Sequence, residues 1–162
     1  MADGYRWLVF VHIASVLTFF LAHGVAASVA LRLRKERDPA RVRALLEVSS
    51  AGVGATMGLA LLVAIASGVW AGFAGDFWGY GWIWASLVLL VVVGGLMTPM
   101  GTLPLGRIRA AAGIARGKAA DVPVADPVEL ERLTASYNPI PIAALGITGL
   151  LLITWLMMFK PF

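Results

Sequence analysis

Two histidines are the side chains of this sequence best suited to chemistry. His12 and His23 are the only histidines, and both lie in residues 7–31, a stretch without Asp, Glu, Lys or Arg. At 3.6 residues per turn, their spacing of eleven residues puts them on one face of a helix, about 16 Å apart along its axis. Ionisable groups inside a membrane are costly, so both are candidate functional residues.

The spacing limits how the histidines could bind haem. Axial ligands lie on opposite sides of one iron, so His12 and His23 are too far apart to share it, and the chain has no third histidine. A haem b would need a methionine as second ligand, a five-coordinate iron, or a residue from another chain. Methionines at matching depth are the candidate second ligands: Met157 and Met158 for His12, and Met57 and Met97 for His23, with Met100 slightly deeper.

Other interpretations of these residues stay open. Imidazole with thioether ligands also suits copper, because soft thioethers favour Cu(I). A histidine within a membrane could instead carry protons, or could simply form a hydrogen bond with a neighbouring helix. Methionine is moreover a common apolar filler.

No second kind of site is evident. The chain has no cysteine, which excludes disulfides, thiolate zinc sites and iron–sulfur clusters. It has no phosphate loop, no HExxH motif and no Ser/His/Asp set. The charge-free stretches hold no carboxylate for a proton relay or a cation site. We therefore predict no catalytic residues and do not expect an enzyme.

The elements that position the histidines are membrane spans. The chain is 60% hydrophobic and 14% charged, against about 45–50% and 25% in soluble domains. Its charge-free stretches are long enough for roughly 20-residue spans. They predict one integral membrane domain, residues 1–162, an all-α bundle of four antiparallel transmembrane helices. The expected spans are about 5–31, 50–73, 82–100 and 139–159.

The basic residues predict the orientation. Six of the thirteen Lys and Arg lie in the loop 32–49 and five in the loop 101–138. By the positive-inside rule both loops are cytoplasmic, and both termini lie outside the cell membrane. The basic excess then reflects topology and attraction to anionic lipid heads, so we expect a lipid bilayer and no nucleic acid as partner.

Both cytoplasmic loops are expected to contain helix. Asp38-Pro39 is a helix start, and we expect that helix to continue unbroken into the second span. The second loop is expected to hold two short interfacial helices. The first would lie on the membrane surface, with Leu105, Ile108, Ala112 and Ala115 on one face and Arg107, Arg109, Arg116 and Lys118 around it. The second would run from Asp126-Pro127 to about Asn138.

Small residues predict how the first two spans pack. They recur every fourth position, which permits close helix approach in lipid. The two stripes are Ala14, Thr18, Ala22, Ala26 and Ala30, and Gly52, Thr56, Ala60, Ala64, Gly68 and Gly72. They should face each other, although the second could instead form a homo-oligomer. The aromatic loop 70–84 is typical of an outer interfacial belt, or of a docking surface for a larger membrane complex or a quinone.

Two short motifs carry a family resemblance: residues 7–13 (Trp-Leu-Val-Phe-Val-His-Ile) and 155–161 (Trp-Leu-Met-Met-Phe-Lys-Pro). With them the chain resembles a family of small four-span bacterial membrane proteins of unknown function. It is distantly similar to the membrane domain of copper-resistance protein D and to bacterial protoporphyrinogen oxidases. The resemblance implies a haem or copper role for His12. The expected function is a haem b-binding, electron-transfer or redox-complex subunit; alternatives are a non-catalytic accessory or assembly protein and a copper-handling protein.

Overall fold

Helices account for all the regular structure in the described residues. The computed structural model describes residues 2–50, 52–115 and 123–162, so Arg116 and Lys118 lie outside the described residues. The helices are α1 (Ala2–Leu33), α2 (Pro39–Ser50), α3 (Val53–Ala74), α4 (Gly81–Ala111), α5 (Pro127–Ser136) and α6 (Ile140–Phe159). Within these residues, α1, α4, α6 and the stretch that ends with α3 are long and apolar enough to cross a membrane. The predicted all-α fold with four spans is confirmed.

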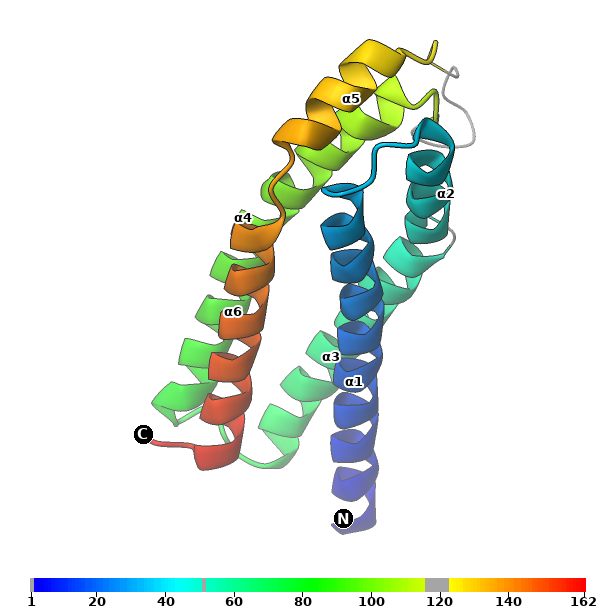
Figure 1. Cartoon of the computed structure of the whole chain (residues 1–162). Helices are drawn as coiled ribbons and strands as arrows, with labels where there is room; N and C mark the ends of the chain where they lie inside the picture. The colour runs from blue at the N-terminus through cyan, green and yellow to red at the C-terminus, as the bar shows by residue number, and fades with distance from the viewer. Residues whose placement is uncertain (1, 51, 116–122) are drawn as a thin grey trace.

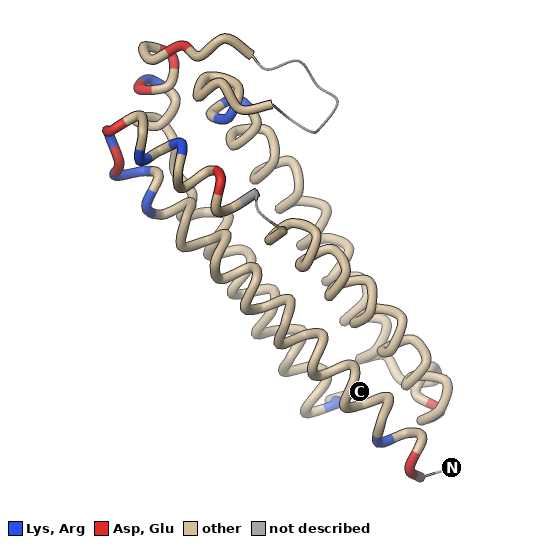
Figure 2. The backbone as a smooth tube through the Cα atoms, turned by 90° about the vertical axis from the view of Figure 1, so that its right-hand side faces the viewer, with Lys and Arg blue, Asp and Glu red and all other residues tan. Residues whose placement is uncertain are grey.

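The long helices form two antiparallel pairs. Helix α1 packs on α3, and α4 packs on α6 (Figure 1). Both chain ends lie at one end of the molecule, and the short helices α2 and α5 lie at the other. Most of the charged residues lie at the end formed by α2 and α5 (Figure 2). We call this region, formed by α2, α5 and the adjoining ends of α1 and α4, the charged cap.

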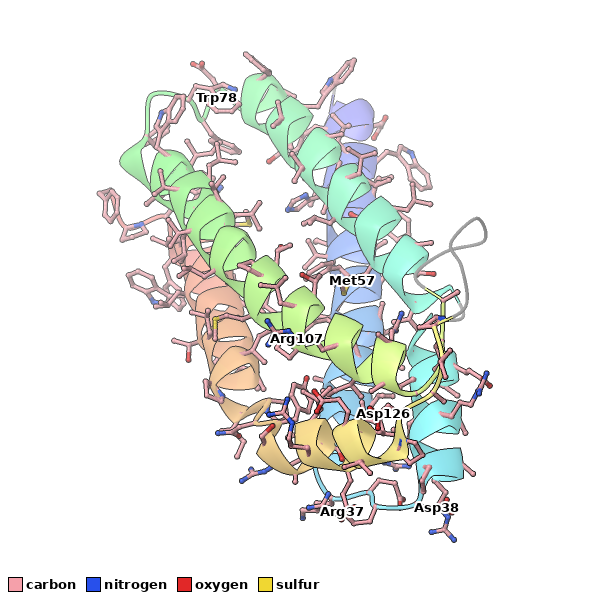
Figure 3. All side chains as sticks on the ribbon, turned by 90° about the horizontal axis from the view of Figure 1, so that it is seen from above. Arg37, Asp38, Met57, Trp78, Arg107 and Asp126 are labelled. Carbon is pink, nitrogen blue, oxygen red and sulfur yellow. The ribbon has the colours of Figure 1, made fainter. Side chains whose placement is uncertain are left out.

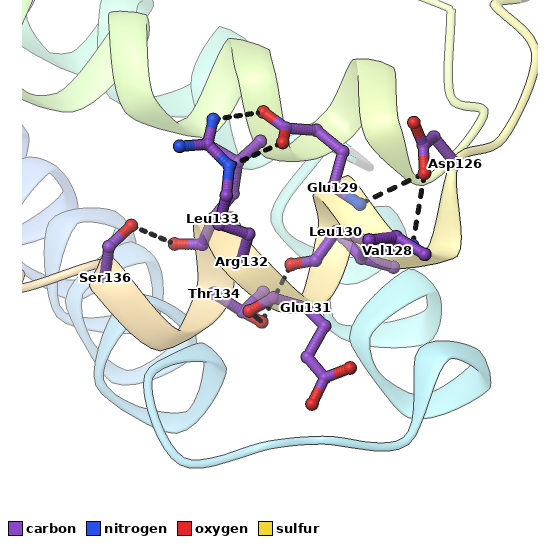
Figure 4. A network of polar contacts seen from close by, with 9 residues as sticks. All are labelled: Asp126, Val128, Glu129, Leu130, Glu131, Arg132, Leu133, Thr134 and Ser136. Carbon is purple, nitrogen blue, oxygen red and sulfur yellow. Dashed lines mark hydrogen bonds and ion pairs between the residues drawn. The ribbon is translucent and has the colours of Figure 1, made fainter.

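Both short helices begin where the sequence predicts. The Asp38 carboxylate accepts a hydrogen bond from the Ala40 amide at 2.9 Å at the start of α2. At the start of α5, the Asp126 carboxylate accepts from the amides of Val128 at 3.1 Å and Glu129 at 3.0 Å (Figure 4). These bonds satisfy amides that have no partner within the helix. The two Asp-Pro starts are therefore confirmed.

The expected unbroken helix from Pro39 into the second span is wrong. Helix α2 ends at Ser50 and α3 starts at Val53. Between them Gly52 has φ +82°, in the left-handed region that glycine adopts without steric strain. This residue, placed in the small-residue stripe, instead changes the direction of the chain between α2 and α3.

The expected surface helix after the third span is also wrong. Helix α4 does not end near Met100 but continues through Pro99 and Pro104 to Ala111. Proline is tolerated inside membrane helices, and neither Pro99 nor Pro104 ends α4. Of the apolar face assigned to the membrane surface, Ile108 and Ala112 are buried in the charged cap and Leu105 is half-buried against them.

The most tightly packed core lies in the charged cap rather than between the spans. Leu33 and Leu46 are 0% exposed and Ile108 is 1% exposed. The buried residues of this cluster are Val29, Ala30, Leu33, Val42, Leu46, Ile108, Ala111, Ala112, Leu130 and Tyr137. A smaller cluster of Trp82, Ile83 and Leu156 lies at the opposite end. The spans between them keep most of their apolar surface exposed, as expected where lipid covers it.

The predicted small-residue contact between α1 and α3 covers only part of each stripe. Ala22 on α1 and Ala60 and Ala64 on α3 are buried. Thr18 and Thr56, which belong to the same stripes, are exposed. The two helices therefore meet along parts of these stripes and diverge elsewhere.

Candidate functional site

His12 is bound to the neighbouring helix of its own pair. Its Nδ1 lies 2.8 Å from the carbonyl oxygen of Ala64 on α3. A carbonyl oxygen only accepts, so Nδ1 carries the hydrogen and the lone pair of the neutral ring is on Nε2. The Ser67 hydroxyl lies 3.4 Å from the same Nδ1 and donates to the Val63 carbonyl at 2.6 Å. The structure thus gives His12 a hydrogen bond between helices.

A glycine makes this approach possible. A methyl group added at Gly68 would lie 2.9 Å from Cε1 and 3.1 Å from Nδ1 of His12. Real side chains essentially never approach so closely, so alanine at this position would force the ring away. Gly68 therefore provides the space that lets the imidazole reach the α3 backbone.

His23 faces the other helix pair. Its ring is half-buried and stacks on Phe19, with centroids 5.8 Å apart and an interplanar angle of 14°. Its Nε2 lies 3.2 Å from the place where a Cβ on Gly146 of α6 would be. Among the described residues neither ring nitrogen of His23 has a hydrogen-bond partner. An unbonded imidazole nitrogen is thus directed at the contact between α1 and α6.

Met97 reaches the same place from α4. Its Sδ lies 3.2 Å and its Cε 2.8 Å from the Cβ position of Gly146. Because Sδ of Met97 and Nε2 of His23 lie equally close to that point, their separation is at most twice this distance. An imidazole nitrogen and a thioether sulfur from opposite helix pairs therefore converge beside Gly146.

The crossing of α1 and α3 explains why the two histidines meet different helices. Helix α3 crosses α1 obliquely, passing from one side of it to the other between the terminal end and the charged cap (Figure 1). Near the terminal end the histidine face of α1 meets α3 at Gly68. Nearer the cap it meets α6 at Gly146. One face of α1 thus has two different neighbours.

The other predicted methionine ligands lie in different surroundings. Met57 is half-buried on α3, and Figure 3 shows it within the bundle. Met157 and Met158 are 36% and 73% exposed on α6, and Met100 is 41% exposed on α4. No described contact brings His12 together with Met157 or Met158. Of the predicted pairs, the structure brings together His23 and Met97.

The expected outer aromatic loop is only partly exposed. Trp82 is buried, whereas Trp70 and Trp84 are more than half exposed. The Lys160 ammonium lies 4.2 Å from the ring centroid of Phe77, and the Trp82 amide donates to the Phe162 carbonyl at 3.1 Å. The loop thus fixes the C-terminal residues and also presents aromatic rings to its surroundings.

Sequence reasoning missed the two glycines that form these contacts. Gly68 was assigned only to a packing stripe, and Gly146 was not singled out. The repeat of Gly146 and Gly149, both buried on α6, was a usable signal of close helix approach. It could not indicate which side chain fills the space above each glycine.

Residues 6–161 match the model of a family described as "Predicted integral membrane protein (DUF2269)". No curated protein and no solved structure matches the chain.

Proposed function

We propose that this chain, a member of the DUF2269 family of predicted integral membrane proteins, binds Cu(I) between its two helix pairs. His23 and Met97 are the proposed ligands. The observation that carries the proposal is the convergence of His23 Nε2 and Met97 Sδ, each 3.2 Å from the Cβ position of Gly146. Small movements of the flexible thioether would adjust their separation to one bound ion.

The ligand chemistry supports a soft ion. A neutral imidazole nitrogen and a thioether sulfur are the donors that suit Cu(I), whereas harder ions require oxygen ligands. No group of three or more His, Cys, Asp or Glu that could hold a metal occurs in the described residues, and Cu(I) does not need one. Both ligands are neutral, so one positive charge is introduced at the contact between the pairs.

Haem b is the second proposed occupant, with the same two residues as axial ligands. Histidine with methionine is a known haem ligand pair. A porphyrin is far wider than the space beside Gly146, where even a methyl group would lie 2.8 Å from Met97 Cε. Haem binding and electron transfer would therefore require the two helix pairs to separate, and geometry favours the bare ion.

Copper titration of the purified full-length chain tests the proposal. We expect one Cu(I) per chain in competition with a colorimetric Cu(I) chelator. His23→Ala and Met97→Leu should each weaken binding by at least about tenfold, whereas the matched control Met100→Leu should not. Equal affinity in all variants would refute the site.

An absorption spectrum of the same preparations distinguishes the occupants. A Soret band that is present in wild type and lost in both His23→Ala and Met97→Leu would identify haem, and not Cu(I), as the occupant. Co-purification with a larger membrane complex, unaffected by either substitution and without bound copper, would favour the accessory or assembly function.

The proposed orientation places the charged cap in the cytoplasm and both termini outside the cell membrane. It is supported by the gathering of Lys and Arg at the cap end (Figure 2). The chain has no cysteine, so single-cysteine variants are simple to interpret. In intact cells a membrane-impermeant maleimide should label Asp3→Cys and not Glu131→Cys; the reverse pattern would invert the topology.

A further inference from the structure

Arg109, in the last turn of α4, is a half-buried cation without an acidic partner. Its Nη2 donates to the Ser49 hydroxyl of α2 at 2.9 Å. Among the described residues its Nε is buried without a hydrogen-bond partner, and no carboxylate forms an ion pair with it. Nη1 has no hydrogen-bond partner among the described residues and, unlike Nε, is not buried. The guanidinium thus has an uncompensated positive charge and N–H donors that an anion could bind.

Neighbouring cations of the charged cap differ in this respect. Arg132 forms an ion pair with Glu129 at 2.6 Å, and Arg43 with Glu47 at 3.3 Å. Arg107, only two residues from Arg109, is exposed and close enough to Glu129 to help lower the pKa of that carboxyl, although the hydrogen bond from Arg132 is the larger cause. Carboxylates therefore form ion pairs with Arg132 and Arg43, and among the described residues no carboxylate forms one with Arg109.

The length of α4 sets the depth of Arg109 in a bilayer. The helix has 31 residues, which corresponds to about 46 Å. A bilayer measures about 40–45 Å including its headgroups. When the aromatic N-terminal turn of α4 lies at one interface, its last turn lies at the headgroups of the opposite leaflet. Exposed apolar side chains such as Leu103 then face the acyl chains.

We propose that Arg109 binds the phosphate of an anionic phospholipid at the charged end of the bundle. Guanidinium binds phosphate through charge-assisted hydrogen bonds, which are stronger than its bond to a neutral hydroxyl. Basic sites between membrane helices are suited to anionic lipid heads. The exposed Nη1 makes the first contact, and a rotation of the side chain brings the buried Nε to the same phosphate. Inorganic phosphate has the same chemistry but lacks acyl chains that contact α4.

Lipid retention by the full-length chain tests this site. The protein is purified in mild detergent with phosphatidylglycerol or phosphatidylcholine, and bound lipid is counted by native mass spectrometry. We expect wild-type chain to retain phosphatidylglycerol selectively. Arg109→Gln should weaken retention by about tenfold, the loss of one charged hydrogen-bonding group. The matched control Arg107→Gln should change it by less than threefold.

Additional arms exclude indirect explanations. Ser49→Ala removes the hydrogen bond and leaves the cation, so it should retain the lipid; equal loss in Ser49→Ala would assign Arg109 a structural role instead. In lipid-free detergent, the free energy of unfolding of Arg109→Gln should equal that of wild type. Equal retention by Arg109→Gln and Arg107→Gln, or stabilisation by inorganic phosphate without phosphatidylglycerol binding, would overturn the proposal.

Discussion

The imidazole ring of His12 lies against the backbone of Gly68, so close that one added methyl group would be 2.9 Å from Cε1. This contact lets Nδ1 donate to the Ala64 carbonyl and joins α1 to α3 within the membrane. It is a specific link between helices whose apolar surfaces gain little from each other in lipid.

Gly68→Ala should therefore destabilise the protein. The new methyl group displaces the ring and breaks its hydrogen bond, and we expect a loss of about 1–3 kcal/mol, typical of overpacking. Gly58→Ala is the control, because its methyl group would meet nothing within 4 Å; it should stabilise α3 by about 0.5–1 kcal/mol. Unfolding in mixed micelles, followed by circular dichroism, measures both. If Gly68→Ala and Gly58→Ala changed the free energy of unfolding equally, the His12 contact would not be formed.

Gly146→Ala should weaken the proposed copper site without removing a ligand. Its methyl group would lie 2.8 Å from Met97 Cε and 3.2 Å from His23 Nε2, and so pushes both ligands apart. We expect Cu(I) affinity to fall about tenfold, as for lost ligand positioning. Gly95→Ala, with open space around it, should bind as wild type does. If Gly146→Ala bound Cu(I) with unchanged affinity, copper would not bind at the contact beside Gly146.

The location of the core predicts an asymmetry between two leucine substitutions. Leu46 in the charged cap is 0% exposed, and Leu59 on α3 is 64% exposed. Leu46→Ala should cost about 2–5 kcal/mol through lost burial and a cavity. Leu59→Ala should cost less than about 1 kcal/mol, because lipid replaces the lost contacts. The same micelle unfolding assay measures both losses in stability. Similar losses for Leu46→Ala and Leu59→Ala would show that the main core does not lie in the charged cap.

Tyr137 should make the charged cap sensitive to alkali. Burial raises the pKa of its phenol, so the folded chain favours the neutral form more than the unfolded chain does. This contribution to stability is complete below the ordinary value of about 10 and is lost as the pH rises through the higher folded-state pKa.

The corresponding measurement is the midpoint of thermal unfolding between pH 8 and 11. Tyr137→Phe should reduce its decline at high pH, whereas Tyr80→Phe, at a 54% exposed position, should leave the decline as in wild type. Parallel curves for Tyr137→Phe and wild type would contradict a buried phenol.

The sequence alone determined the number of spans, the two Asp-Pro helix starts and the segregation of cations. These features are local. In lipid every backbone polar group must find its hydrogen-bond partner within its own helix. Long charge-free stretches therefore form membrane-spanning helices. A carboxylate next to the first turn caps that turn wherever the helix lies. Met97 could be proposed as a partner of His23 because depth follows from position along a span.

Tertiary structure alone decided what each histidine contacts. His12 and His23 share one face of α1, yet one meets Gly68 of α3 and the other meets Gly146 of α6. The helix crossing that separates them depends on how side chains of different helices fit together, and no periodicity within one helix encodes it. Helix α4 likewise continues past Pro99 and Pro104 despite their low helix propensity.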